Sequence, residues 1–343
     1  EEKILGATER IQKLESFLFG ELKKEVISYL NLINTYSSII AYLDAICGFA
    51  EISMKNNYVK PEIVNDDVLI LKDARHPVVE RYLKDGSFVP NDLTLDTDTR
   101  TIILTGPNMS GKSVYLRQTA LIVIMAQMGC FVPCEKAVIG LVDRIMTRIG
   151  AFDRLVKGES TFMVEMKETA NILKLATKRS LILLDEIGRG TSTFDGISIA
   201  YAVCEYIHKK IGAKVLFATH FFEITELAKR YPGIENYNIA VKEWVNSEGK
   251  IEISFLHKVV KGPCDRSYGI HVAEIAGLPK DCIKRAREIL LELEKRNVDK
   301  KSENNMLPFP DDNPIVERLK LIDTNNITPI QALNILNELK KLS

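Results

Sequence analysis

The apolar residues of this chain change their spacing along its length, and the change divides the sequence into regions. From residue 4 to about residue 52 they recur every three or four positions, as in the stripe of an amphipathic helix. The stripe is formed by Ile4, Ile11, Leu14, Leu18, Leu22, Leu30, Ile33, Ile40 and Leu43. This pattern predicts long helices that serve as arms or struts and not as a catalytic core.

Short apolar runs that are typical of β-strands follow a turn-rich stretch at residues 55–66. Three such runs lie between residues 68 and 105, and strand and helix patterns then alternate to about residue 225. This alternation predicts an α/β fold with a mostly parallel sheet. Residues 239–245 and 251–257 alternate in period two around the turn Asn-Ser-Glu-Gly, which predicts a β-hairpin.

The C-terminal part of the chain is helical in pattern but is interrupted by a polar tract. A helix is predicted at 278–296, and the tract at 297–305 is predicted to be a linker. Two further helical patterns follow at 314–322 and 328–342, and the second begins with Thr-Pro, a residue pair suited to a helix start.

Composition restricts the class of protein. The 343 residues contain 46 Lys and Arg and 46 Asp and Glu, so no net charge draws the whole chain to nucleic acid or membrane. Six cysteines are scattered without CxxC pairs, which favours a reduced, cytosolic compartment. No apolar run is expected to reach the roughly 18 residues that span a bilayer. The opening residues resemble neither a signal peptide nor a start with Met, so we expect a fragment of a longer protein.

The first candidate site is the segment LTGPNMSGKS, residues 104–113, which follows a β-like run and precedes a helical pattern. Gly106, Gly111, Lys112 and Ser113 satisfy GxxxxGK[ST], the pattern of a phosphate-binding P-loop. Glycines let backbone N–H groups turn towards an anion, and the N-terminus of the next helix adds a favourable dipole. Lysine is expected to reach the β- and γ-phosphates, and the serine hydroxyl to bind Mg²⁺. The alternative is a chance glycine loop, which the flanking strand and helix disfavour.

A second candidate site lies at the end of the apolar run SLILLDEIGRG, where Asp185 and Glu186 follow a predicted buried strand. Asp185 is expected to hold Mg²⁺, and Glu186 to polarise the water that attacks the γ-phosphate. A third apolar run ends in His220, which is suited to contact the γ-phosphate or that water. The alternatives are a solvated acidic strand end and a structural histidine. Parallel strands would bring these side chains to one carboxyl edge beside Thr105.

Four stretches together make the chain resemble the MutS family of bacterial DNA mismatch repair ATPases. They read TGPNMSGKSVYLRQTA, GESTFMVEMKETANIL, LLDEIGRGTSTFDGISIAYA and FATHFFEITEL, in this order and with family-like spacings. The resemblance covers nearly the whole chain and implies a P-loop NTPase domain of the ABC-ATPase type that dimerises head to tail around ATP or ADP with Mg²⁺. It implies lever helices at 1–56, the ATPase domain at 57–297, a linker at 298–312 and C-terminal oligomerisation helices at 313–343.

The resemblance also implies roles for single residues. It gives metal binding to Ser113 and Asp185, catalytic water activation to Glu186 and nucleotide sensing to His220. Phosphate binding falls to Gly106, Pro107, Asn108, Met109, Ser110, Gly111, Lys112 and Ser113.

Three further residues enter only through the family pattern. Phe88 and His257 match an aromatic residue and a histidine that flank the adenine base. Ser160 stands in the segment that replaces the signature sequence of transporters, where it would act on the nucleotide of the partner subunit. Without the resemblance, Phe88 is expected in the core, His257 at a strand end on the surface, and Ser160 as a helix N-cap.

The chain departs from the family before Ser160, where GAFDRLVKGES places Phe152 and Arg154 instead of small and acidic residues. By resemblance the parent protein binds mismatched DNA through parts that this chain lacks, and it has a MutL-type partner and no membrane contact. Residues 305–309, NMLPF, resemble weakly a peptide that binds the sliding clamp.

Other classes of protein remain as alternatives. An ATPase related to SMC proteins or Rad50 would need a transporter-type signature and a long coiled coil. The second bacterial MutS paralogue, linked to recombination or ribosome rescue, would usually add a nuclease-like domain, and its loop lacks the sequence GPNM. A protein in which nucleotide only joins subunits is disfavoured by Glu186.

Overall fold

The computed structural model describes residues 2–83, 87–150, 160–245, 251–263, 268–303 and 334–335. The chain forms two compact units, Glu1–Gly269 and Ile270–Ser343, and each is described by itself. The candidate site lies in the first unit.

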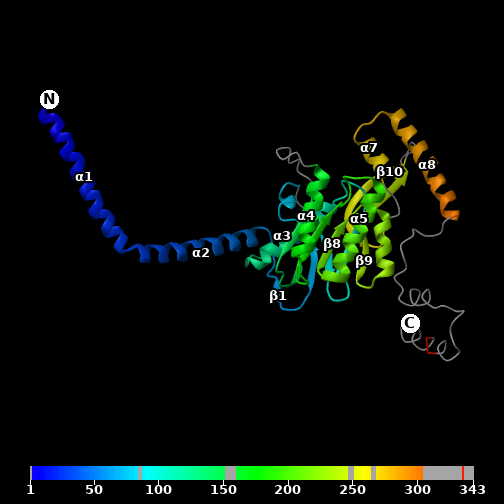
Figure 1. The fold of residues 1–343 in the computed structure, drawn as a ribbon, viewed down its shortest axis with the longest axis horizontal. Coiled ribbons are helices and arrows are strands. Elements are labelled where there is room, and N and C mark those ends of the chain that lie inside the picture. The colour runs from blue at the N-terminus through cyan, green and yellow to red at the C-terminus, as the bar shows by residue number, and fades with distance from the viewer. Residues whose placement is uncertain are drawn as a thin grey trace. The chain divides into compact units, whose positions relative to one another are not determined.

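Two long helices begin the chain, as the apolar spacing predicts: α1 (Glu2–Ser28) and α2 (Leu30–Lys55). Figure 1 shows them as two successive helices. They are separated at Tyr29, whose backbone N–H donates to the Val26 carbonyl oxygen at 3.1 Å. Large apolar side chains are exposed along both helices, so each helix has an apolar surface that nothing within the described residues covers.

Among the described helices, α2 is long and apolar enough to cross a bilayer by length and composition alone. One such helix is a weak indication, since helices of water-soluble proteins pass the same test. In addition, α2 contains Asp44 and Glu51, and charged side chains are costly inside lipid.

A six-stranded sheet forms the centre of the first unit, with the strand order β10-β9-β4-β8-β7-β6. The five strands β9, β4, β8, β7 and β6 are parallel to one another in the sheet, and β10 is antiparallel to β9. The strands are β4 (Thr101–Thr105), β6 (Ile145–Arg148), β7 (Leu181–Asp185), β8 (Lys214–Ala218), β9 (Ile234–Val245) and β10 (Ile251–Lys261). Both the parallel sheet and the β9–β10 hairpin confirm the sequence prediction.

The central strands are almost continuously buried, which is why their sequences lack the alternation of a half-exposed strand. Helix α3 (Lys112–Gln127) packs against β7 and β8. Its buried side chains share one core with side chains of the four-stranded sheet and of the central sheet. The other helices of the first unit that follow are α4 (Thr161–Leu175), α5 (Thr193–Tyr206), the π-helical turn η3 (Ile207–Ile211), the 3-10 helix η4 (Phe222–Glu226) and α6 (Leu227–Arg230).

A separate four-stranded sheet, with the order β1-β5-β2-β3, was not predicted from the sequence. Its strand β5 follows α3 in the chain and returns to pair with strands that precede the central sheet. A period-two pattern locates such strands but does not say which sheet they join. The strands are β1 (Glu62–Val64), β2 (Leu69–Ala74), β3 (Asn91–Leu95) and β5 (Lys136–Gly140), and the short 3-10 helix η1 (Val79–Arg81) lies between β2 and β3.

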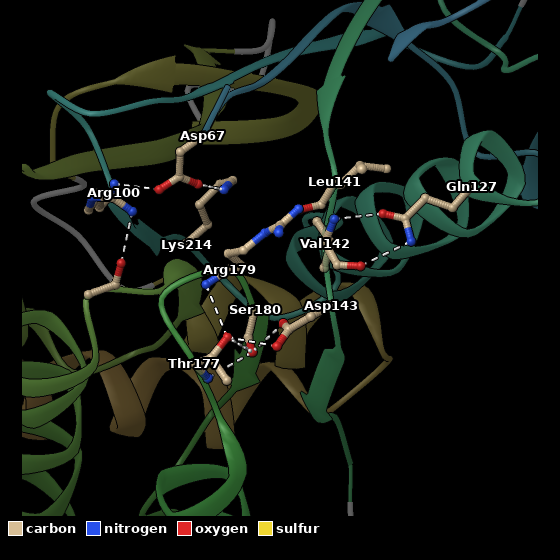
Figure 2. A network of polar contacts seen from close by, with 11 residues as sticks. Asp67, Arg100, Gln127, Leu141, Val142, Asp143, Thr177, Arg179, Ser180 and Lys214 are labelled. Carbon is tan, nitrogen blue, oxygen red and sulfur yellow. Dashed lines mark hydrogen bonds and ion pairs between the residues drawn. The ribbon is translucent and has the colours of Figure 1, made fainter. Parts of the chain in front are cut away.

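A charged network joins the two sheets at the amino ends of β4 and β8 (Figure 2). Asp67, between β1 and β2, pairs with Arg100 at 2.5 Å through one carboxylate oxygen and with Lys214 through the other. The Lys214 side chain is only 1% exposed, so Asp67 supplies the counter-charge for a buried ammonium group. This network lies at the edge of the sheet opposite to the carboxyl ends of the strands.

The second unit contains α7 (Gly269–Ile275) and α8 (Lys280–Glu303). Helix α8 continues beyond residue 296, where the sequence pattern predicted its end. Residues 334 and 335 are helical, in agreement with the prediction for 328–342, but the rest of that segment and the peptide 305–309 lie outside the described residues.

Candidate functional site

The loop 106–111 lies between β4 and α3 at the carboxyl edge of the central sheet, where the sequence predicted it. Gly111 has a φ of 110°, a conformation that favours glycine, and it turns the chain into α3. Lys112 is the first residue of α3 and its side chain is 4% exposed. Its ammonium donates to the carbonyl oxygens of Gly106 at 2.6 Å and Pro107 at 3.0 Å. The loop therefore surrounds the ammonium group of Lys112 at the N-terminus of α3, an arrangement suited to binding an anion.

The two carboxylates after β7 lie beside this loop. The Ser113 hydroxyl hydrogen-bonds Asp185, and Lys112 Nζ is 3.9 Å from a Glu186 oxygen. Burial raises the pKa of Asp185, the Ser113 bond opposes this rise, and the Glu186 charge reinforces it. A cation would relieve the same burial penalty, so the Ser113 and Asp185 oxygens fit the hard-ligand preference of Mg²⁺.

Glu186 is held in an unusual backbone conformation, with a φ of 54°. Its N–H donates to the Ala218 carbonyl oxygen at 2.9 Å, which ties β7 to the end of β8. Its carboxylate accepts a bond from Arg189 Nη1 at 2.5 Å. Non-glycine residues with such φ values persist only where the surroundings hold them, and they are frequent at functional sites.

His220 follows β8 at the same edge, as predicted, and its ring lies 4.1 Å from that of Phe221. It is within electrostatic range of Glu186 and Lys112. The structure therefore brings Lys112, Ser113, Asp185, Glu186 and His220 together at one edge of the sheet.

Phe88 and His257 line one cavity of about 250 Å³ that also borders the loop at Met109 and Gly111. The other lining residues are Val79, Leu83, Ser87, Val89, Asn91, Val114, Tyr115, Gln118, Ile239 and Val259. The cavity is mostly apolar, as expected for a pocket that receives a flat base.

His257 stands at a bulge of β10, where the pairing with β9 shifts between Phe255 and Val259, and it has a φ of 52°. Its Nδ1 is 2.7 Å from the carbonyl oxygen of Ser110, so the bulge is fastened to the loop. The Asn91 side chain makes two hydrogen bonds to the backbone of the bulge. Its Nδ2 donates to the carbonyl oxygen of His257 at 2.9 Å, and its Oδ1 accepts from the N–H of Val259 at 2.7 Å.

Ser160 is the N-cap of α4, and its hydroxyl accepts a hydrogen bond from the Met163 N–H at 3.1 Å. Its side chain is exposed and is not among the residues that line the cavity. The structure confirms the capping role and leaves the second role, on a partner's nucleotide, as a proposal. Phe152 and Arg154 lie outside the described residues.

No group of three or more His, Cys, Asp or Glu side chains within the described ranges is placed to hold a metal ion. The Ser113–Asp185 pair would need further ligands from phosphate oxygens and water to hold a cation.

Comparison with known proteins finds family matches in two separate regions of the chain. The family described as MutS domain V matches residues 102–294, which is more than half of the chain. The chain belongs to the MutS family. A second family, described as the DNA mismatch repair protein MutS C-terminal region, matches residues 309–342. The resemblance seen in the sequence is thus confirmed.

Curated MutS relatives match this chain along its whole length. The DNA mismatch repair protein MutS of Caldicellulosiruptor bescii is 51% identical over 99% of the chain and 41% of the relative. That of Syntrophomonas wolfei is 49% identical over 100% of the chain, and that of Thermodesulfovibrio yellowstonii is 50% identical over 99%. The chain spans about two fifths of the length of these MutS proteins, and 40% of those from S. wolfei and T. yellowstonii.

Sequence reasoning missed several residues of this MutS site. Asn91, Tyr115 and Gln118 line the cavity and fix its walls through hydrogen bonds to backbone carbonyl groups of His257, Asp92 and Ala74. The one sequence signal for Asn91 was an amide within a strand-like run, and the structure shows that this amide is buried and therefore needs partners on a neighbouring element. No comparable signal distinguished Tyr115 from an ordinary core residue of α3.

Proposed function

We propose that this chain is the Mg²⁺-dependent ATPase domain of a DNA mismatch repair protein, a P-loop NTPase of the ABC type. The observation that supports this function most directly is the proximity of Lys112, Ser113, Asp185 and Glu186 at one sheet edge. A buried ammonium, a hydroxyl and two carboxylates at a helix N-terminus are the parts that phosphoryl transfer to water needs.

In this proposal the residues Gly106–Ser113 cradle the phosphates of ATP. Lys112 moves its ammonium from the loop carbonyl groups to the β- and γ-phosphates, and backbone N–H groups at the start of α3 point at the same anion. A Mg²⁺ ion held by Ser113 and Asp185 would neutralise charge on the phosphate oxygens.

Glu186 orients the attacking water and accepts its proton, and it must leave Arg189 to do so. His220 contacts the γ-phosphate or this water and senses which nucleotide is bound. The adenine base lies between Phe88 and His257 in the 250 Å³ cavity, stacked on flat rings.

The domain acts as a homodimer in which Ser160 and the N-terminus of α4 approach the γ-phosphate bound by the partner subunit. ATP therefore favours the closed dimer and ADP the open one, because only ATP offers this contact. Lever helices at 1–56 pass the change from the ATPase domain at 57–297 to a clamp on mismatched DNA, which belongs to other parts of the parent protein. Their exposed apolar surfaces suit packing against such parts.

The linker expected at 298–312 overlaps the end of α8, which runs to Glu303, so we place its start after α8, and we assign residues 313–343 to oligomerisation helices. A MutL-type protein and, through residues 305–309, the sliding clamp are the proposed protein partners, and the cytoplasm is the proposed compartment. The five described cysteines are free thiols, which suits that compartment: Cys47, Cys130, Cys134, Cys204 and Cys282.

The test is phosphate release from ATP by the 343-residue chain, with and without Mg²⁺, together with ATP affinity by calorimetry. Lys112→Ala should weaken ATP binding by roughly 10- to 100-fold, since it removes charge-assisted bonds to phosphate. Lys174→Ala, which changes an exposed lysine in α4, is the matched control and should bind like the parent. Unchanged ATP affinity in Lys112→Ala would refute the P-loop assignment, and a parent chain without phosphate release would refute the ATPase.

A further inference from the structure

A buried ion pair outside the phosphate loop joins the central sheet to α4. Arg148, the last residue of β6, and Glu165 of α4 have side chains that are 5% and 6% exposed, and Arg148 Nη2 lies 3.1 Å from Glu165 Oε2. Arg148 also donates through Nη1 to the Gly150 oxygen at 2.5 Å. Buried pairs of this kind add little net stability over an apolar pair of the same shape, so their position in the fold is the more informative property.

The other oxygen of Glu165 holds the segment that follows Glu186. Oε1 accepts the backbone N–H of Gly188 at 2.6 Å, and this bond is buried. Gly188 is only two residues after Glu186. Because Arg148 fixes one oxygen of the carboxylate, the second oxygen has a set direction towards Gly188, and bonds to an ionised carboxylate are among the stronger hydrogen bonds in proteins.

A second contact joins α4 to the same segment. Gly190 lies against Phe162 so closely that a Cβ atom at Gly190 would be 3.1 Å from the Phe162 Cβ. Phe162 and Glu165 are three residues apart on α4 and therefore share one face of the helix. The segment 188–190 is thus held by one face of α4 at two points.

The remaining contacts leave this segment little freedom. Gly188 has a φ of 87°, and a Cβ atom there would be 2.5 Å from the Gly196 carbonyl oxygen in α5. On the other side, the Glu186 N–H donates to the carbonyl oxygen of Ala218, the last residue of β8. The position of Glu186, with its positive φ, therefore depends on β8, α5 and α4 together.

We propose that Glu165, oriented by Arg148, is a positioning residue that couples the two ATP sites of the dimer. Helix α4 has Ser160 at its start, which in the proposed dimer would face the partner's nucleotide, and Glu165 in its second turn, which fixes the segment next to Glu186 of its own site. Contact between Ser160 and the partner's γ-phosphate is transmitted along α4 to the geometry of Glu186. This inference rests on the proposed ATPase and its dimer.

The first test compares Glu165→Gln with Glu168→Gln in the full chain. Glu168 also neighbours Arg148, with 3.4 Å between the charged groups, but it is 44% exposed and does not bond to Gly188. We expect Glu165→Gln to lower kcat for ATP hydrolysis by about 10- to 100-fold, since small misplacements of a catalytic group have effects of this size, and to leave ADP affinity unchanged. Glu168→Gln should match the parent in both.

A variant that leaves Arg148 unpaired can fail to fold, so a second variant separates folding from positioning. Arg148→Gln/Glu165→Gln removes both buried charges and lets two amides pair. It should fold, as judged by circular dichroism and ADP binding, and still show the low kcat. Recovery of parent kcat in this folded double variant would show a merely structural role and overturn the proposal.

Coupling is tested by combining Glu165→Gln with Ser160→Ala. If both act through α4, the double variant should be no slower than the slower single variant, because the second change removes nothing further. If the fold-decrease in kcat of the double variant equals the product of the decreases in the two single variants, the proposed coupling is overturned. If the parent chain releases no phosphate, the proposed ATPase fails and this inference fails with it. If the parent is active and Glu165→Gln equals Glu168→Gln, only the inference fails.

Discussion

Phe88 and His257 are far apart in the sequence, yet they line one cavity beside Gly111. Each is supported by a different element: Phe88 precedes β3, and His257 belongs to the bulge of β10. A base held between them would contribute stacking that is the same for ATP and ADP, since the two nucleotides share adenine. Base contacts and γ-phosphate contacts can therefore be separated by comparing the two nucleotides.

Replacing Phe88 by Ala is expected to weaken ATP and ADP binding equally, by roughly fivefold, because about 1 kcal/mol of stacking is lost. His257→Ala should behave in the same way. Titration calorimetry with both nucleotides measures the effect, and Phe131→Ala, which changes an aromatic residue outside this cavity, is the control. Loss of ATP affinity with unchanged ADP affinity would remove the changed residue from the base site.

These residues also show what sequence can locate. The loop 106–113 and the Asp185–Glu186 pair were predicted from the residues themselves, because each is a contiguous signal next to a buried strand. Phe88 and His257 came only from the family pattern. They come together because Asn91 bonds to the β10 bulge, and the spacing of residues in the sequence does not predict this tertiary contact.

At the scale of elements, the bulge of β10 is the feature that places His257 over the loop. The pairing with β9 shifts between Phe255 and Val259, and at this shift the Asn91 side chain bonds to both the carbonyl group of His257 and the N–H of Val259. Asn91 is 5% exposed, so water cannot easily replace it.

Asn91→Ala should lower the free energy of unfolding by about 2 kcal/mol, since it leaves two backbone groups without partners, and should also weaken ADP binding. Urea unfolding and calorimetry measure the two effects. Asn238→Ala on β9 is the matched control: Asn238 makes a single bond to the Gly262 oxygen and does not line the cavity, so ADP affinity should stay at the parent value. Asn91→Ala with full ADP affinity would contradict a positioning role for the bulge.

The positions of helices and strands along the chain were predicted more completely than the pairing of the strands into sheets. Buried strands, the hairpin and the two long N-terminal helices follow from apolar spacing. The four-stranded sheet does not, because β5 pairs with β1 and β2 across a long sequence separation, and pairing partners are chosen by the packing of the whole unit.

At the scale of the first unit, the two ends of the central sheet have different tasks. The carboxyl edge holds the candidate site, and the amino edge is fastened to the four-stranded sheet by Asp67, Arg100 and Lys214 (Figure 2). Burial tends to raise the pKa of Asp67, but its bonds to Lys214 and Arg100 outweigh this and hold that pKa below its usual value.

Because the folded pKa of Asp67 is lowered, its contribution to stability is present above the unfolded pKa of about 3.9 and is lost as pH falls through the folded value. Asp67→Asn should lower the free energy of unfolding at pH 7 by about 3 kcal/mol, since it leaves buried Lys214 unpaired. The difference from the parent should shrink below about pH 4. Urea unfolding at several pH values measures this.

Glu226→Gln is the control for that series, because the Glu226–Lys229 pair is exposed and should contribute roughly 0–1 kcal/mol. A parent and an Asp67→Asn variant that differ equally at neutral and acidic pH would show that the Asp67 charge is not the stabilising feature.

The central claim is that the carboxyl edge of the sheet hydrolyses ATP with Glu186 as the group that activates water. Phosphate release by Glu186→Gln, measured beside ATP affinity in the same chain with Mg²⁺, tests it most directly. The expected result is binding close to that of the parent and turnover at least about 100-fold slower, because the amide keeps the shape and loses the proton acceptor. Hydrolysis by Glu186→Gln at the parent rate would contradict the account.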